Sequence, residues 1–366
     1  MGITGGSLFQ ITRWDDVEHA LRDPQTFSSA SNLEHMAPYM GELILGMDGN
    51  EHREYRSLVA PAFRASRLAH WEDAVIRPSI EMYVDEIAPL GRAELVSDIT
   101  RRFPARVICA IVGVPVEDSA QFQEWSELIN GGPMHPKAGM AASRAMREYL
   151  EPLVEARRAE PRADLLSDLV HAEVDGEHLT DERLYGFLRL LLPAGAETTY
   201  RAMGNALTAL LLHPDVMERV VADRDLVPAL IEETLRWETP VAQVSRVATT
   251  DTDVAGCPIP AGGAVAVIVG SADREATRYD DGERFDIDRS VQTHLAFGTG
   301  PHQCLGMHLA RLELRVGLDV VLERLPNLRL DPAASPPVIE GLAFRGPTSL
   351  PVLFDASPSA AEGAIR

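Results

Sequence analysis

The segment from Thr180 to Leu212 predicts one long helix, and this helix constrains the fold more than any other part of the sequence. Thr180 is a suitable N-cap, Asp181 and Glu182 favour the positive end of the helix dipole, and Pro214 ends the run. At 1.5 Å per residue the helix spans roughly 45–50 Å, enough to cross a whole domain. We therefore expect a central helix around which the rest of the chain packs.

Helical patterns also dominate the rest of the first two thirds of the chain, where apolar residues recur at three- and four-residue spacing. The stretch 245–267 differs, because β-branched residues broken by Gly and Pro predict short strands and turns. We find no internal repeat, and the small, polar tail 355–366 is expected to fray. The sequence predicts a single domain, 1–366, mainly α with a minor β region. Further helices are predicted at 14–23, 66–87, 140–160, 213–223 and 225–237.

Charge and cysteine usage exclude several classes of protein. A formal net charge of −21 argues against a nucleic-acid or anionic-membrane partner, since both would be repelled by the average surface. The three cysteines, Cys109, Cys257 and Cys304, lie far apart and follow no signal segment, which is typical of a reducing cytoplasm. No apolar run reaches the roughly 18 residues of a transmembrane helix.

The stretch FGTGPHQCLGMHLAR, 297–311, carries the most specific chemistry. Leucines recur at helical spacing from Leu305, so a helix is expected to begin just after Cys304. A thiolate at that position faces free backbone N–H groups and the positive end of the dipole, which lower its pKa. Phe297 could cover the sulfur. Three glycines leave room for something flat and bulky against the backbone, namely Gly298, Gly300 and Gly306.

Three interpretations of Cys304 compete. It could be a buried structural cysteine, as free cysteines often are. It could join His302 and His308 in a zinc site, although a fourth local ligand and the usual paired cysteines are absent. It could be the thiolate of a haem, which needs one protein ligand and leaves the opposite side of the iron open for oxygen.

The stretch FGTGPHQCLG resembles the cysteine signature of the cytochrome P450 family. The resemblance covers nearly the whole chain, from ITRWDDV to LPVLF, although family members usually carry more residues before GGSLFQITRWDDV. It implies the family's fold, with haem b (iron protoporphyrin IX) between the long helix and the helix after the cysteine. The matching positions are Phe297, Gly298, Gly300, His302, Cys304 and Gly306.

The resemblance also implies which residues bind the cofactor. Cys304 becomes the axial ligand of the iron. The haem propionates need cations, and His52 and Arg56 lie four residues apart on one face of a predicted helix. Arg246 and His302 match two further propionate-binding positions.

The middle of the long helix, LLLPAGAETTY, contains a second signature. Pro193 removes a backbone N–H and Gly195 is a poor helix former, so the helix is expected to kink or open there. Oxygen activation consumes protons, and an acid followed by an alcohol can relay them through water. The resemblance assigns this relay to Glu197 and Thr198.

A third signature is ETLR, Glu233 to Arg236, which alone would be an ordinary helical ion pair. In the family the matching Glu and Arg join a further arginine in a buried network that supports the cysteine loop. We expect Arg284 to be that arginine, with Arg289 as the alternative.

The activity that the resemblance implies is insertion of one oxygen atom of O₂ into a hydrophobic small molecule. Apolar segments expected near the substrate contain Met36, Met40 and Met47, then Val241, Ala242 and Val244, then Phe344, with Gln243 as a polar contact. Arg345 matches a family pattern and is not read as a carboxylate clamp. Electrons are expected from an external ferredoxin and ferredoxin reductase, steered by a basic patch of Arg53, Arg64, Arg311 and Arg315. Two alternatives stay open: a peroxide-using or rearranging haem-thiolate enzyme, and a haem or small-molecule binding protein without turnover.

Overall fold

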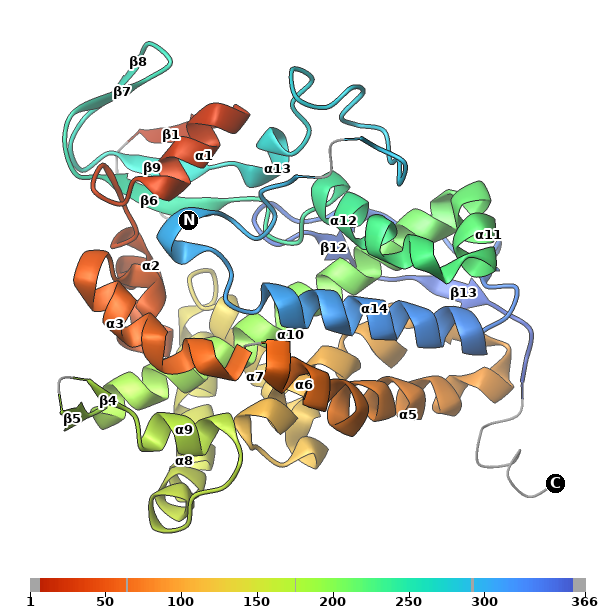
Figure 1. Ribbon diagram of the computed structural model, residues 1–366, viewed down its shortest axis with the longest axis horizontal. Helices are drawn as coiled ribbons and strands as arrows, with labels where there is room; N and C mark the ends of the chain where they lie inside the picture. Colours follow the sequence, from red (N-terminus) through yellow and green to blue (C-terminus); the bar gives the residue numbers. More distant parts are fainter. Residues whose placement is uncertain (1–6, 64, 175, 291–292, 358–366) are drawn as a thin grey trace.

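Helix α10, Asp181–Leu212, runs through the centre of the fold, as predicted. The computed structural model describes residues 7–63, 65–174, 176–290 and 293–357 (Figure 1). The Thr180 hydroxyl caps α10 by accepting from the Arg183 N–H over 3.4 Å. The helix continues unbroken through Pro193, so the predicted opening does not interrupt it. Gly195 instead allows a close approach of Ile108, whose side chain would lie 2.7 Å from an added Cβ.

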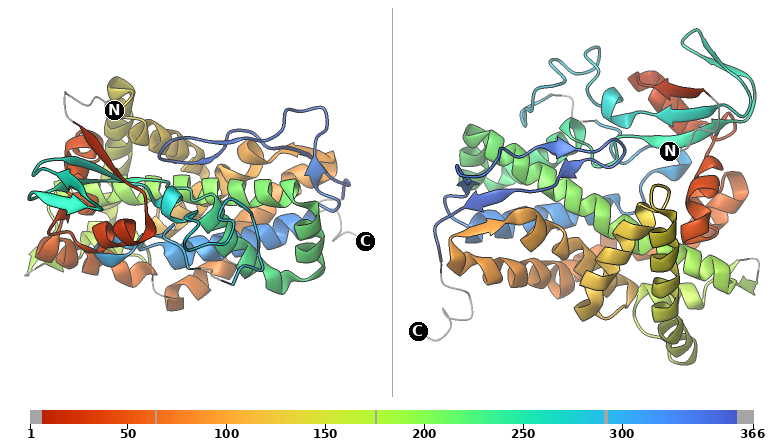
Figure 2. Two further views of the ribbon diagram at one scale, coloured as in Figure 1. Left: turned by 90° about the horizontal axis from the view of Figure 1, so that it is seen from above. Right: turned by 180° about the vertical axis from the view of Figure 1, so that it is seen from behind.

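The other helices surround α10, which crosses the molecule diagonally when seen from behind (Figure 2). Helices α6, α7 and α14 pack directly on it. The predicted helix 66–87 is divided by a π-helical turn at 72–76. The helices are α1 Trp14–Arg22, α2 Ser31–Met40, α3 Gly49–Val59, α4 Ala65–Trp71, α5 Arg77–Ile87, α6 Arg102–Val112, α7 Ser119–Asn130, α8 Pro136–Ala159, α9 Leu165–Val170, α11 Pro214–Ala222, α12 Val227–Trp237, α13 Val269–Ala272 and α14 Met307–Arg324.

The β structure is minor and forms small sheets beside the helices (Figure 1). One sheet has the order β1-β9-β6-β2, in which β1 pairs with β9 in parallel and β6 pairs with β9 antiparallel. Another has the order β10-β13-β3. The strands are β1 Leu8–Ile11, β2 Phe27–Ser28, β3 Arg92–Glu94, β4 Glu173–Val174, β5 Glu177–His178, β6 Val244–Ala248, β7 Thr252–Val254, β8 Cys257–Ile259, β9 Ala264–Val267, β10 Arg329–Leu330, β11 Ile339–Glu340, β12 Gly346–Pro347 and β13 Pro351–Leu353.

The predicted fold class, mainly α with a minor β region, is confirmed. The larger apolar cluster surrounds α10, and a smaller one lies between α1 and the β1-β9-β6-β2 sheet. None of the helices in the described ranges is long and apolar enough to cross a membrane. Most of the tail 355–366 lies outside the described residues, but its first residues are held by hydrogen bonds, including Ser357 N–H to the Ala88 carbonyl.

Candidate functional site

The cysteine loop, residues 294–306, folds back on itself before α14 begins. Gly298 and Gly300 have φ of +63° and +73°, a left-handed conformation that glycine adopts without strain. The backbone N–H of Cys304 donates to the Phe297 carbonyl over 2.8 Å and closes the loop. Helix α14 starts at Met307, slightly later than the leucine spacing predicts. The loop therefore holds Cys304 at a fixed place just before the helix.

The Cys304 thiol borders a space that protein atoms do not fill. The residue is exposed, yet burial raises its pKa, while the Gly306 N–H and the charges of Arg56 and Arg311 act to lower it. These facts agree if the sulfur lies deep in the molecule and faces an internal hollow. A Cβ added at Gly298 or Gly306 would meet no atom within 4 Å. The loop thus leaves room beside the sulfur for a bulky group.

The central helix has one open face in an otherwise buried element. Ala194 is exposed, and Leu191 and Thr198 are only partly buried, whereas their neighbours along α10 are mostly buried. Spacings of three and four residues place these three on one side of the helix. We call this side the open stripe. A stripe of this kind in the middle of a core helix indicates a hollow beside it.

Two arginines near the loop lack a carboxylate partner. Arg246 on β6 is 5% exposed, and within the described ranges its guanidinium donates to the neighbouring Ser245 carbonyl, 2.8 Å away. Arg56 on α3 donates to the Gln303 carbonyl over 2.5 Å. Neither forms an ion pair within the described part of the chain. Because burial lowers the pKa of both, an anionic ligand would stabilise them.

Two histidines lie close together near the cysteine loop. The rings of His52 and His302 lie 4.1 Å apart, and His302 Nε2 is 3.4 Å from a carboxylate oxygen of Asp48. His52 is 2% exposed, and its Nδ1 atom has no hydrogen-bond partner among the described residues. Burial, His302 and Arg56 together lower its pKa to about 4. An unpartnered buried nitrogen is costly unless a ligand accepts from it. His302 faces these neighbours, and no three candidate ligands gather as a metal site in the described ranges, so the zinc interpretation is wrong.

The chemistry of this set fits the predicted cofactor. Arg56 and Arg246 carry obligatory charge, whereas Asp48 supplies one carboxylate, so the site has room for further negative charge. A flat group with two carboxylates meets this requirement, and the thiol of Cys304 faces the hollow where such a group would lie. The four propionate-binding candidates and the cysteine are compatible with haem b.

Glu197 and Thr198 are adjacent on α10 but have different surroundings. Glu197 is buried, pairs with Arg201 at 2.8 Å and accepts from Asn130 of α7. Thr198 lies on the open stripe, and its hydroxyl donates to the Ala194 carbonyl over 2.9 Å. Their described contacts do not join the two side chains, so a proton relay between them requires water.

The ETLR signature forms a buried network. Arg236 is fully buried and binds Glu233 through two hydrogen bonds of 2.7 and 2.8 Å. Arg289 is the third member, with its Nε 3.4 Å from Glu233 Oε1. The preference for Arg284 is wrong: its side chain is exposed, 3.8 Å from Asp286, and only its carbonyl accepts from Arg236. This network ties α12 to the segment that leads into the cysteine loop.

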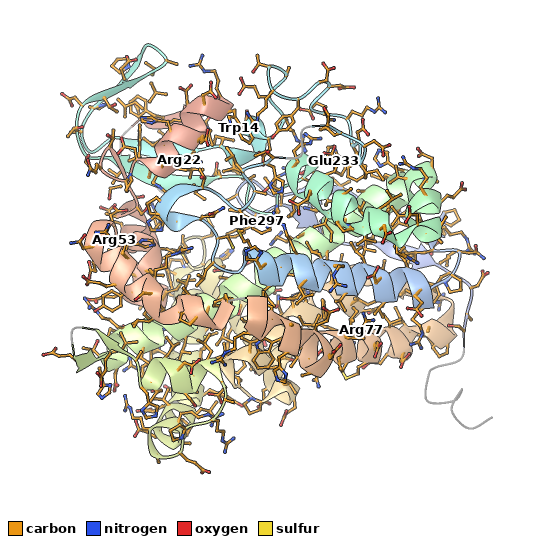
Figure 3. All side chains as sticks on the ribbon, in the orientation of Figure 1. Trp14, Arg22, Arg53, Arg77, Glu233 and Phe297 are labelled. Atoms are coloured by element: carbon orange, nitrogen blue, oxygen red, sulfur yellow. The ribbon has the colours of Figure 1, made fainter. Side chains whose placement is uncertain are left out.

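The predicted basic patch is largely neutralised within the molecule. Arg311 forms two hydrogen bonds with Glu232, of 2.6 and 2.8 Å, and Arg315 pairs with Glu72 at 2.7 Å. Arg53 lies on the outer side of α3 (Figure 3), where it bonds to Asn50. The fourth residue, Arg64, lies outside the described residues. Arg311 and Arg315 lie on the flanking helix α14, as expected, but each is paired with a glutamate, so the predicted basic patch is weaker at these two positions.

The segments expected near the substrate are brought together in part. Val241 and Phe344 pair in an isolated β-bridge, although far apart in the sequence. Arg345 pairs with Glu238 at 2.9 Å, which agrees with the expectation that it is no carboxylate clamp. Several of the apolar candidates are core residues: Met40, Met47 and Ala242.

Sequence reasoning missed several residues of this region. Asp48 stands at the N-cap of α3, but its carboxylate bonds to Ser28 and His302 and does not cap the helix. The sequence signal at Asp48 is therefore that of a helix cap, whereas in the structure the carboxylate bonds to other side chains. Asn130 is 67 residues from Glu197 along the chain, and no local pattern signals their contact.

Comparison with known proteins agrees with this geometry. The cytochrome P450 family model matches residues 128–343. Cytochrome P450 107B1 of Saccharopolyspora erythraea is 36% identical, over 96% of this chain and 90% of that protein. Steroid C26-monooxygenase of Mycolicibacterium smegmatis is also 36% identical, over 96% of this chain and 88% of its own. The structure of cytochrome P450 CYP109Q5 from Chondromyces apiculatus has a TM-score of 0.87 at 34% identity, covering 96% and 90% of the two chains. The chain belongs to the cytochrome P450 family.

Proposed function

We propose that Cys304 is the axial thiolate of haem b and that His52, Arg56, Arg246 and His302 bind its propionates. The observation that carries this proposal is the exposed thiol at a deep position, together with the buried Arg246 and the half-buried Arg56, which form no ion pair among the described residues, and the buried His52. The hollow between the cysteine loop and the open stripe of α10 is the proposed place of the cofactor. We assign Phe297, Gly298 and Gly306 of the loop to the same cofactor site. The chain would then act as one haem-thiolate domain, 1–366.

The protein is a cytochrome P450 monooxygenase. Bound haem supplies reductive activation of O₂ and transfer of one oxygen atom to the substrate. The protein's own residues supply protons and exclude bulk water. We assign proton donation to Glu197, which Arg201 and Asn130 hold in place, and delivery within the hollow to Thr198 on the open stripe.

The substrate is a hydrophobic small molecule. Relatives of this chain are named for steroid oxidation and for ω-hydroxylation of methyl-branched lipids. We propose a substrate of this apolar character here, because the open stripe offers Leu191 and Ala194 beside the single hydroxyl of Thr198. Titrating the haem-loaded protein with steroids and fatty acids tests this through displacement of the iron-bound water, seen as a Soret shift. A response to polar compounds alone would contradict it.

The electron donor is proposed to be a ferredoxin with its reductase, acting in the cytoplasm. The described cysteines are free, which suits a reducing compartment. Because Arg311 and Arg315 are neutralised, docking would depend on Arg53 and on surface shape more than on a broad basic field. Turnover with a surrogate ferredoxin should therefore respond weakly to salt; a steep loss of rate with ionic strength would contradict this.

A further inference from the structure

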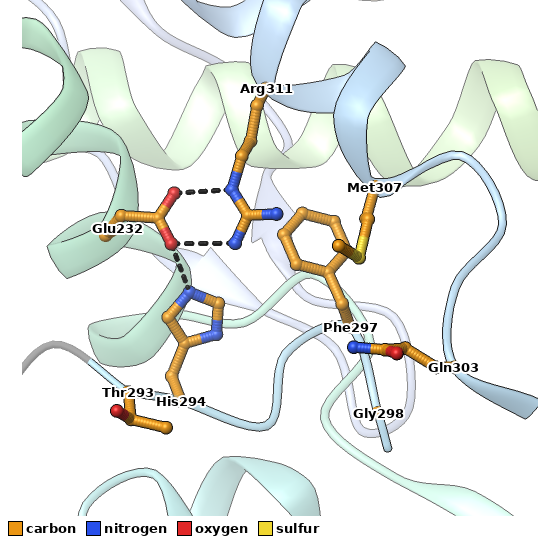
Figure 4. Close-up of a pocket in the computed structure, with 8 residues that line it drawn as sticks. All are labelled: Glu232, Thr293, His294, Phe297, Gly298, Gln303, Met307 and Arg311. Atoms are coloured by element: carbon orange, nitrogen blue, oxygen red, sulfur yellow. Dashed lines mark hydrogen bonds and ion pairs between the residues drawn. The ribbon is translucent and has the colours of Figure 1, made fainter. Parts of the chain in front are cut away.

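Glu232 of α12 contacts both Arg311 and His294 in a polar cluster beside the cysteine loop (Figure 4). Its Oε1 accepts from Arg311 Nε over 2.6 Å and its Oε2 from Arg311 Nη2 over 2.8 Å. His294 Nε2 lies 3.1 Å from Oε2. The Glu232 side chain is 24% exposed, and these residues line a small pocket of about 150 Å³ together with Phe297. The ETLR signature includes the next residue but not Glu232.

His294 connects this carboxylate to the backbone of the cysteine loop. Its Nδ1 accepts from the Ala296 N–H over 3.2 Å, so the proton of the neutral ring is on Nε2, which donates to Glu232. The side chain is only 4% exposed. Ala296 precedes Phe297, whose carbonyl accepts from the Cys304 N–H. Glu232 therefore holds the loop at a point close to the thiol.

Arg311 reaches the same loop from the other side. It lies on α14, two turns beyond the cysteine, and its guanidinium is 4.5 Å from the centre of the Phe297 ring. Its positive charge is one of the two that act on the Cys304 thiol, the other being that of Arg56. Because Glu232 binds Arg311 in a bidentate ion pair, the pair as a whole is neutral.

We propose that Glu232 and Arg311 form a charge-balanced pair that sets the electrostatic potential at Cys304, and through it the reduction potential of the bound haem. This inference rests on the proposed ligation by Cys304. One-electron reduction adds negative charge to the haem–thiolate unit. An uncompensated positive charge nearby favours the reduced state, and an uncompensated negative charge favours the oxidised state.

Spectroelectrochemical titration of the haem-loaded full chain tests the proposal. Glu232→Gln leaves Arg311 uncompensated and is expected to move the midpoint potential to more positive values. Arg311→Gln leaves Glu232 uncompensated and is expected to move it to more negative values. At the wild-type midpoint, the ratio of reduced to oxidised haem should change several-fold in opposite directions. The double variant should lie closer to the wild type than either single variant.

Control variants separate the effect of charge on the midpoint potential from the effect of the pair on the packing of the cysteine loop. Glu232→Asp and Arg311→Lys keep the charges and should keep the potential near that of the wild type. Arg324→Gln breaks an ion pair with Asp85 at the far end of the same helix and should not change it. Thermal unfolding of each variant measures the loss of packing separately.

The outcomes are distinct. If both charge-removing variants shift the potential in the same direction, or neither shifts it, the pair only supports the loop and the proposal is overturned. The proposal would also be overturned if Glu232→Asp and Arg311→Lys shifted the midpoint potential as much as Glu232→Gln and Arg311→Gln do. A wild-type protein without the red-shifted thiolate band of the reduced carbon-monoxide complex would contradict the proposed function itself, whereas a normal band with shifts of one sign contradicts this inference alone.

Discussion

Replacing Arg236 by methionine is expected to destabilise the protein by about 3–5 kcal/mol. The guanidinium is fully buried and forms two hydrogen bonds with Glu233. It also donates to three backbone carbonyls at 2.8–3.0 Å, those of Asp273, Gly282 and Arg284. The substitution leaves the Glu233 carboxylate buried with one weak ion pair, 3.4 Å away, and leaves the three carbonyls without this donor.

Equilibrium unfolding in urea, followed by circular dichroism, measures this loss. Arg219→Met is the matched control, because its bidentate pair with Asp288 has similar distances of 2.7 and 2.9 Å but lies on the surface. That change should cost little, because a solvent-exposed ion pair contributes little to stability. Adding Glu233→Leu to Arg236→Met should recover part of the loss, since the buried carboxylate is removed and Arg289 keeps its hydrogen bonds to the carbonyls of Asp280, Asp281 and Arg284. A loss for Arg236→Met no larger than that of Arg219→Met would refute the reasoning.

Three further predictions concern the cofactor site. Thr198→Ala should release more peroxide and form several-fold less product per electron consumed. Thr199→Ala, the same change at a buried position outside the open stripe, should leave both quantities unchanged. Equal product yield per electron in the two variants would contradict the proton relay. Arg246→Met should weaken haem retention by roughly 10- to 150-fold, because a charge-assisted hydrogen bond to a propionate is worth about 1.5–3 kcal/mol. Transfer of haem to a competing apoprotein measures this, and unchanged retention would exclude Arg246 from the site. Burial raises the pKa of Glu232, but hydrogen bonds from Arg311 and His294 outweigh it and hold the pKa at about 2. Since this value lies below the ordinary value of 4.5, the carboxylate stabilises the fold above pH 4.5. Roughly 1–3 kcal/mol, with solvent screening taken into account, is lost as the pH falls from 4.5 towards 2. Acid unfolding of Glu232→Gln should therefore be less steep in this window, and an unchanged profile would contradict the assignment.

The sequence predicted those features that depend on interactions between residues close together in the chain. The cap at Thr180 and the length of α10 follow from side-chain to backbone bonding and from helical periodicity, which a sequence shows directly. Gly298 and Gly300 were expected only to leave room for a flat group, and their left-handed turn appears in the structure alone. The cysteine loop was predicted from its residue pattern and not from this turn.

Contacts between distant segments were less predictable. Arg284 and Arg289 lie in one loop, and their positions in the chain do not show which guanidinium turns inward to Glu233. Arg311 has the sequence context of a surface helix, yet Glu232 on a neighbouring helix binds it beside the loop. In both cases the tertiary packing of α12 decides the role of the arginine. Arginine is ambiguous in this respect, because its long side chain can reach either solvent or a buried carboxylate.

The central claim is that Cys304 is the thiolate ligand of a haem. The most direct test is the absorption spectrum of the haem-loaded protein after reduction and addition of carbon monoxide, for the wild type and for Cys304→Ser, with Cys257→Ser as a control at another exposed cysteine. The wild type and Cys257→Ser should show the red-shifted Soret band of thiolate ligation, and Cys304→Ser should lose it. Absence of the band from the wild type, or its persistence in Cys304→Ser, would contradict the account.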